Sequence, residues 1–105
     1  MKYIKKFENV NVPQIGDYAI VDNTSVNKNL NDFLSNNIAE IVDKYEIETY
    51  WGKINYYKFK YENIPFGLSE SFSNDTIGFT ELTIGYFSKN KEDVEARIQS
   101  KKYNL

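Results

Sequence analysis

Residues 57–62, Tyr-Lys-Phe-Lys-Tyr-Glu, alternate strictly between an aromatic and a charged side chain. Successive side chains of a β-strand point to opposite faces, so this spacing gives the strand one aromatic face and one charged face. Such a strand is typical of an antiparallel sheet that covers a core on one side and meets water on the other. The pattern therefore predicts a strand over Ile54 to Glu62 in a half-exposed sheet.

Three further segments have the β-branched and aromatic composition of strands and are bounded by turn residues. They are Tyr18 to Val21, Ile38 to Ile47 and Phe79 to Phe87. In the last of them, Leu82, Ile84 and Tyr86 share one predicted face. Because the connections are too short for crossovers, we expect antiparallel pairing. The expected fold is α+β, with a strongly bent antiparallel sheet or half-barrel of about four to five strands.

A short helix is predicted directly after the first strand. Leu30, Phe33 and Leu34 follow the i, i+3, i+4 spacing of an apolar helix face. Asn27 or Asn29 can cap its first turn. The helix should end at the Asn pair 36–37, since Asn tolerates the conformations found at helix ends.

A second helix is expected over residues 90–102. Asn90 is a favourable N-cap, and Val94 and Ile98 share the face that would pack inward. The length of 105 residues is that of one domain, so we expect residues 1–105 to fold as a unit. Its parts are a lead-in over residues 1–14, a sheet or barrel over 15–87 and the C-terminal helix.

Residues 16–21 read Gly-Asp-Tyr-Ala-Ile-Val, residues 38–42 read Ile-Ala-Glu-Ile-Val, and residues 57–62 form the aromatic strand. In this order they resemble the strands of small SH3-like barrels of the KOW or Tudor kind. Ala39 stands where the KOW pattern has Gly, and a helix separates the first two strands. The resemblance covers residues 15–62, with an extension to residues 77–87, and implies a barrel that binds peptides, proteins or nucleic acid.

The chain opens with MKYIKKFEN and ends with YFSKNKEDVEARIQSKKYNL. Both ends resemble those of small uncharacterised phage proteins. This resemblance implies a phage accessory protein that would act in the cytoplasm of the host.

The chain contains neither Cys nor His. Disulfides are therefore excluded, and zinc and haem lack their usual ligands. The N-terminal residues have no apolar run long enough for a signal peptide, and no stretch is long enough to span a membrane. We expect a cytoplasmic protein with no cofactor, no metal and no membrane partner.

The same composition argues against catalysis, because the commonest general base, His, and the best nucleophile, Cys, are absent. The serines of the predicted loop over residues 68–77 have no Lys nearby in that loop, and no phosphate-binding motif is present. The candidate carboxylate pairs are Glu70 with Asp75 and Glu40 with Asp43. Such pairs are common on surfaces, and Asn74 with Asp75 supplies too few oxygens for calcium. We therefore expect no enzyme activity, no catalytic residue and no metal ligand.

Residues 47–57 read IETYWGKINYY and form an aromatic turn that holds the only Trp of the chain. In one interpretation, Trp51 folds back over the end of the barrel and closes the core. In the other, the turn is an exposed binding site, because Trp and Tyr supply much of the energy of protein interfaces. The candidate partner-binding residues are Tyr45, Glu48, Tyr50, Trp51 and Tyr56.

Three functions follow. The first is a non-catalytic protein-binding module, such as a phage anti-defence protein that inhibits a host complex by direct binding. The second is a nucleic-acid-binding barrel with a face formed by Lys53, Lys58 and Lys60, against which the net charge of −2 counts. The third is a structural or assembly protein in which a homo-oligomer covers the aromatic side chains.

Overall fold

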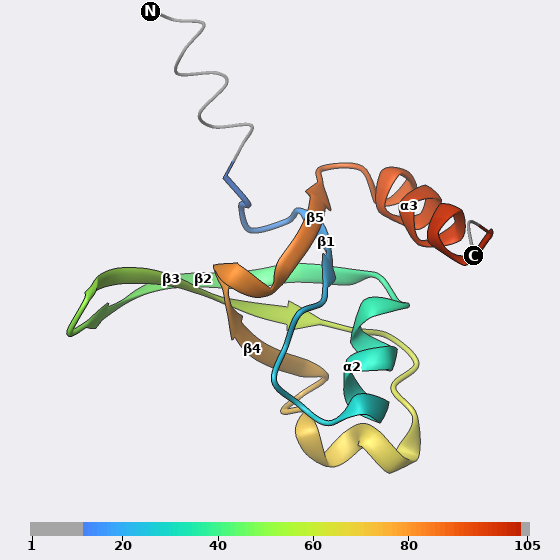
Figure 1. Ribbon diagram of the computed structural model, residues 1–105, viewed down its shortest axis with the longest axis horizontal. Helices are drawn as coiled ribbons and strands as arrows, with labels where there is room; N and C mark the ends of the chain where they lie inside the picture. Colours follow the sequence, from blue (N-terminus) through green and yellow to red (C-terminus); the bar gives the residue numbers. More distant parts are fainter. Residues whose placement is uncertain (1–11, 104–105) are drawn as a thin grey trace, which may run out of the picture.

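The computed structural model describes residues 12–103, which form a five-stranded antiparallel sheet in the order β4-β3-β2-β1-β5 (Figure 1). The strands are β1 (Tyr18–Val21), β2 (Ala39–Thr49), β3 (Gly52–Lys60), β4 (Thr76–Thr80) and β5 (Ile84–Ser88). The helices are α2 (Lys28–Ser35) and α3 (Lys91–Tyr103), with 3-10 turns η1 (Phe66–Ser71) and η2 (Glu81–Thr83). The α+β class, the antiparallel sheet and the C-terminal helix are confirmed. Most of the lead-in predicted over residues 1–14 lies outside the described residues.

The main core lies between one face of the sheet and α2. Ile41, Tyr57 and Phe59 from β2 and β3 are completely buried there, against Leu30 and Leu34 of α2. Across residues 57–62 the aromatic side chains are buried and the charged ones are exposed. The alternation in the sequence therefore predicted both faces of β3 correctly.

The short helix predicted after the first strand is α2. Asn27 is its N-cap, and its side-chain oxygen accepts a hydrogen bond of 2.9 Å from the backbone N–H of Leu30. At the other end, Asn36 donates its backbone N–H to the carbonyl of Asp32. The two capping Asn residues thus fix both ends of a helix of only two turns.

A second cluster of buried residues lies on the opposite face of β1. It contains Ile20 of β1 with Val94 and Ile98 of α3, the pair predicted to face inward. The neighbours of Ile20 in β1, Ala19 and Val21, belong to the main core. Because side chains alternate along a strand, α2 and α3 cover opposite faces of the sheet at β1. Figure 1 shows the two helices on either side of this strand.

The single strand predicted over Phe79 to Phe87 is wrong, because this segment forms β4 and β5 at opposite edges of the sheet. β4 pairs with β3, β5 pairs with β1, and η2 carries the chain from one edge to the other. Thr83 holds this turn: its hydroxyl donates to the carbonyl of Thr80 (2.8 Å), and its own carbonyl accepts the N–H of Asp22 (2.8 Å). Leu82, predicted to share a face with Ile84 and Tyr86, lies in η2 and is 74% exposed.

Within the described residues the sheet is not closed, because β4 and β5 stand at its two edges and do not pair with each other. The SH3-like barrel is therefore not confirmed. The predicted loop over residues 68–77 is more ordered than expected: it contains most of η1, and β4 already begins at Thr76. Asn74 and Asp75 form a tight turn at positive φ (52° and 64°) between Ser73 and Thr76. Asn and Asp tolerate this conformation better than other side chains, so the turn explains both residues without a bound ion.

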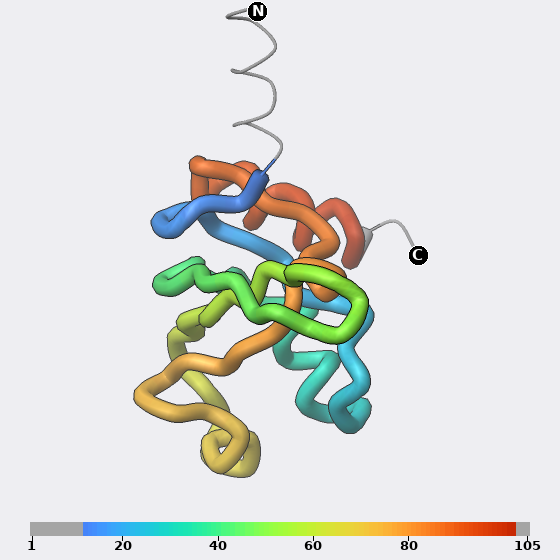
Figure 2. Tube along the Cα trace, turned by 90° about the vertical axis from the view of Figure 1, so that its left-hand side faces the viewer, coloured from blue at the N-terminus to red at the C-terminus, as the bar shows by residue number. Residues whose placement is uncertain are grey.

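The outer half of the β2–β3 hairpin extends beyond the rest of the sheet. β1 pairs with β2 only at Ala39 and Glu40, and the pairing of β4 with β3 begins at Tyr56. Residues 43–55, named here the hairpin arm, therefore have no strand beside them among the described residues. Figure 1 shows the arm projecting to the left, and Figure 2, turned by 90°, shows its tip in front of the sheet.

Candidate functional site

The tip of the hairpin arm is a tight turn in which Tyr50 and Trp51 are the two loop residues, because Thr49 pairs with Gly52. The Thr49 hydroxyl donates to the carbonyl of Gly52 (2.6 Å) and accepts the backbone N–H of Trp51 (3.2 Å). Gly52 has a φ of +123°, a conformation that side-chain-bearing residues rarely adopt. Thr49 and Gly52 therefore hold the turn, and the side chains of Tyr50 and Trp51 take no part in holding it.

Tyr50 and Trp51 are 92% and 89% exposed. Their rings contact each other edge to face, with centroids 5.1 Å apart and planes at 89°. The interpretation of Trp51 as a lid over the core is therefore wrong. The core lacks any need for such a lid, because α2 already covers the face that Tyr57 and Phe59 line.

One face of the arm, named here the outer aromatic face, carries two apolar cross-strand pairs. They are Tyr45 with Tyr56 and Ile47 with Ile54. The two Tyr rings pack 5.4 Å apart, and Tyr45 and Ile47 are 39% and 38% exposed. Apolar side chains in direct cross-strand register stabilise a hairpin, so these pairs keep the arm in one register.

Tyr56 anchors the outer aromatic face to the body of the sheet. Its hydroxyl donates to the carbonyl of Gly78 in β4 (3.2 Å). A Cβ atom at Gly78 would lie 2.7 Å from Cε2 of this ring, so only glycine lets the ring lie across β4. Tyr57, which sequence analysis placed in the same aromatic cluster, points to the other face and is buried in the core.

Charged residues occupy the opposite face of the arm. Glu48 stands across from Lys53, and the Lys53 ammonium lies 3.9 Å from the Glu46 carboxylate. Both members of this ion pair are mostly exposed, so it adds little stability. The structure therefore separates Glu48 from Tyr45 and Tyr56, which lie on the outer aromatic face.

The three lysines of the alternative nucleic-acid face do not form one basic surface. Lys58 and Lys60 share a face of β3, where each stands opposite a carboxylate of β2: Asp43 and Glu40, respectively. Lys53 lies on the other face of the strand, since an odd number of positions separates it from Lys58. The cross-strand carboxylates offset the positive charge that a phosphate backbone would require.

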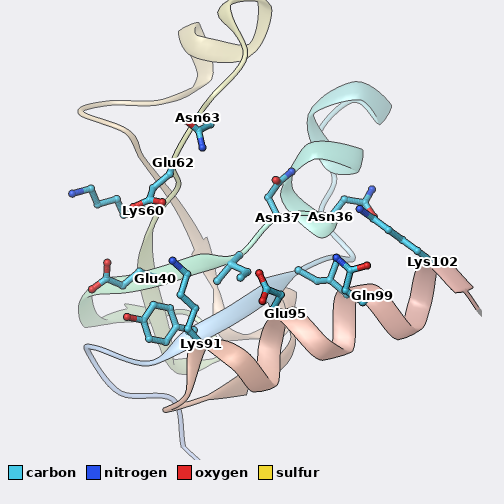
Figure 3. Close-up of a pocket in the computed structure, with 13 residues that line it drawn as sticks. Asn36, Asn37, Glu40, Lys60, Glu62, Asn63, Lys91, Glu95, Gln99 and Lys102 are labelled. Carbon is cyan, nitrogen blue, oxygen red and sulfur yellow. The ribbon is translucent and has the colours of Figure 1, made fainter.

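A groove with a volume of about 420 Å³ lies between α3, the start of β2 and the end of α2. Figure 3 shows Lys91, Glu95 and Gln99 of α3 on one side of it, with Glu40 and the amides that follow α2 on the other. Its lining includes three carboxylates and three lysines, so the groove favours neither sign of charge. They are Glu40, Glu62, Glu95, Lys60, Lys91 and Lys102.

Two buried tyrosines on the core side differ in how their hydroxyls are satisfied. The Tyr61 hydroxyl donates to the carbonyl of Leu34 (3.1 Å), whereas the Tyr57 hydroxyl has no hydrogen-bond partner among the described residues. Burial raises the pKa of Tyr61. The pKa of Tyr57 is raised by burial first, and then by the negative charges of Glu81 and Asp17. Both phenols are therefore neutral at physiological pH, and neither is poised as a base.

Residues 12–103 contain no group of three or more acidic side chains that could hold a metal ion. None of the described helices is long and apolar enough to cross a membrane. No protein-family model, curated protein or solved structure matches the chain. The candidate site therefore rests on the geometry of the arm alone.

Sequence analysis placed Ile47 in the aromatic turn but missed its partner Ile54, as well as Gly78, against which the ring of Tyr56 lies. Ile54 could have been found from the hairpin itself: with Thr49 paired to Gly52, residues 47 and 54 must stand opposite each other. Gly78 could not have been found, because its contact with Tyr56 depends on which strand lies beside β3.

Proposed function

We propose that this protein is a non-catalytic protein-binding module that contacts its partner with the hairpin arm. The observation that carries the proposal is the exposure of Tyr50 and Trp51 at the tip of a projecting hairpin. Exposing such large rings to water has a cost, and the turn itself is held by other residues. Trp and Tyr are also the residues most often found at the energetic centre of interfaces.

The outer aromatic face extends the contact surface from the tip toward the sheet. Tyr45 and Ile47 are each more than a third exposed, and Tyr45 packs on the ring of Tyr56, which Gly78 holds in place. A partner therefore meets aromatic groups that are already ordered, and ordering them costs little on binding. Glu46, Glu48 and Lys53 line the opposite face and give the arm a charged rim of mixed sign.

We also propose that the bent sheet is an SH3-like half-barrel. It is supported by the direct connection through η2, which carries the chain from the β4 edge to the β5 edge of the sheet. We further propose that the protein acts as a phage accessory protein that inhibits a host complex by direct binding. The support for this is the resemblance of residues 1–9 and 86–105 to the ends of small phage proteins.

The test compares Trp51→Ala with Phe66→Ala in a tagged pull-down from nuclease-treated lysate of the host. Phe66 is the matched control, because it is 95% exposed in η1, away from the arm (Figure 1). We expect both variants to fold, Phe66→Ala to retain the partner and Trp51→Ala to lose it. Truncating a hot-spot Trp costs about 2 kcal/mol or more of binding free energy.

Retention of the partner by Trp51→Ala would contradict the proposal. A bound fraction that disappears with nuclease treatment alone would instead favour nucleic acid. In that case, charge reversal at Lys58 and Lys60 should abolish binding, and affinity should fall steeply with salt.

A further inference from the structure

A pocket with a volume of about 310 Å³ lies between α3 and the face of β1 and β5 that α3 covers. Its lining includes an apolar pair from the two strands, one carboxylate, one glycine and two cations: Ile20, Tyr86, Asp22, Gly85, Arg97 and Lys101. Figure 1 shows α3 on the side of the molecule away from the hairpin arm. The pocket is therefore separate from the candidate site of the arm.

The helix side of the pocket carries two cations. Arg97 is the only arginine of the chain, and its guanidinium carbon lies 4.7 Å from the centroid of the Tyr86 ring, over that ring. The ring holds the guanidinium by cation–π attraction and leaves its N–H groups for other partners. Lys101 follows one turn later on the same side of α3. Among the described residues neither cation takes part in an ion pair, so this side is prepared for an anionic group.

The sheet side of the pocket carries a carboxylate. Asp22 directly follows β1, and its backbone N–H donates to the carbonyl of Thr83 (2.8 Å), which fixes its place. Its side chain is half-buried and lies against Gly85, where an added Cβ atom would be 2.5 Å from Oδ2. Any side chain at residue 85 would therefore push the carboxylate aside. Within residues 12–103 the carboxylate has no ion pair, so it can accept hydrogen bonds from a cationic group.

We propose that this pocket binds a free α-amino acid in its zwitterionic form. The carboxylate of the ligand lies between Arg97 and Lys101, and its ammonium group donates to Asp22. An α-amino acid carries both charges on neighbouring atoms, so it satisfies the two sides of the pocket at once. A phosphate group would satisfy the two cations, but the Asp22 carboxylate would repel it.

The larger groove beside α3 does not share this arrangement. There Glu40 stands directly opposite Lys60 in the β2–β3 ladder, so a carboxylate and an ammonium group already offset each other. In the smaller pocket the two signs of charge come from different elements and face each other across the cavity. This inference concerns α3 and the end of β1, and it stands whether or not the arm binds a partner.

The experiment titrates the isotope-labelled full chain with a mixture of the common protein amino acids and follows the pocket by NMR. Because the chain has a single arginine, the Nε–H of Arg97 gives one signal, and the amide of Gly85 reports on the opposite side. We expect both signals to shift. The amino acid responsible is then compared with its N-acetyl derivative, which lacks the ammonium group, and with its amide, which lacks the carboxylate. Each derivative should bind at least about tenfold more weakly, because one charged end is lost.

Two variants test the two sides of the pocket. Asp22→Asn removes the charge on the sheet side and Lys101→Gln removes one on the helix side, so each should weaken binding at least about tenfold. The matched control is Lys102→Gln, which makes the same change at the next residue. Lys102 lines the larger groove, so this variant should bind the amino acid as the unaltered chain does. Far-ultraviolet circular dichroism checks that each variant has folded.

Four results would overturn the proposal. The first is that no amino acid shifts the signals of Arg97 and Gly85. The second is that either derivative binds as well as the amino acid, since the pocket would then recognise only one charged end. The third is that inorganic phosphate shifts the same signals as strongly, which would indicate a general anion site. The fourth is an equal effect of Lys101→Gln and Lys102→Gln, which would place the ligand outside this pocket.

Discussion

The two halves of the β2–β3 hairpin both carry apolar cross-strand pairs, but they differ in how far these pairs are buried. Near the base, Ile41 and Phe59 stand opposite each other and are completely buried. In the arm, Ile47 stands opposite Ile54 in the same ladder, yet Ile47 is 38% exposed. The base has β1 and β4 beside it, and α2 covers the face that Ile41 and Phe59 share. Ile47 and Ile54 lie on the opposite face of the hairpin, in a part where neither β1 nor β4 stands beside it. The comparison shows that alternation forms a strand, while the neighbouring elements decide whether its apolar face becomes core or contact surface.

The largest expected difference between the halves is in stability. Phe59→Ala should lower the free energy of unfolding by about 3–5 kcal/mol, because it leaves a cavity in the main core. Ile47→Ala should lower it by less than about 1 kcal/mol, because that side chain is already partly in water. Urea denaturation of the two variants measures both values. Equal losses would mean that the arm is packed as tightly as the base.

A glycine at the junction links the two halves. Gly78→Ala should cost about 1–3 kcal/mol, because the added Cβ pushes against the ring of Tyr56. The displaced ring would also leave Tyr45, so the near-ultraviolet circular dichroism of the aromatic groups should change. A stability unchanged by Gly78→Ala would show that Tyr56 moves freely and does not anchor the arm.

Two tyrosines of the core differ in a smaller way. Tyr61→Phe removes the hydrogen bond to the carbonyl of Leu34 and should cost about 1 kcal/mol. Tyr57→Phe removes a buried hydroxyl that has no partner among the described residues, so stability should stay the same or rise. Thermal denaturation of the two variants under one condition makes the comparison. A clear loss on Tyr57→Phe would reveal a hydrogen bond to a bound water.

Alkaline pH should lower the stability of the folded chain through the same two tyrosines. The pKa of both phenols is raised in the folded chain, so the folded state keeps its protons at a pH where the unfolded chain loses them. Their contribution is complete below the ordinary tyrosine pKa of 10.0 and is lost as the pH rises above it. Tyr61→Phe should reduce the slope of stability against pH in that range. If Tyr61→Phe left the slope unchanged, the buried phenol of Tyr61 would not be the cause of the loss of stability at alkaline pH.

The smallest effect on stability is expected at the tip. Trp51→Ala should change the free energy of unfolding by no more than about 0.5 kcal/mol, because the ring is exposed and the turn depends on Thr49 and Gly52. Since Trp51 is the only tryptophan, its emission should also lie at the wavelength of a hydrated ring before unfolding. Blue-shifted emission of the free chain would place the ring in an apolar contact, so the tip would then be partly buried like the base of the hairpin.

Much of the local structure could be predicted from the sequence. The strand Tyr18–Val21 has the predicted bounds, Asn27 caps the helix that Leu30 and Leu34 indicate, and Val94 and Ile98 pack inward as their spacing requires. The pairing partners were harder to predict. Leu82, Ile84 and Tyr86 alternate as in a single strand, whereas the strand pairing and the hydrogen bonds of Thr83 show that the chain crosses there from one sheet edge to the other.

The sequence by itself determined the alternation of β3, the two helices and the presence of an aromatic turn, because these depend on side chains a few residues apart. Only the tertiary structure decided that Trp51 is exposed and that β2 keeps a free edge beyond Ile41. These features depend on where β1 and β4 end beside the long hairpin. No local pattern in residues 43–55 records where a strand from another part of the chain will stop.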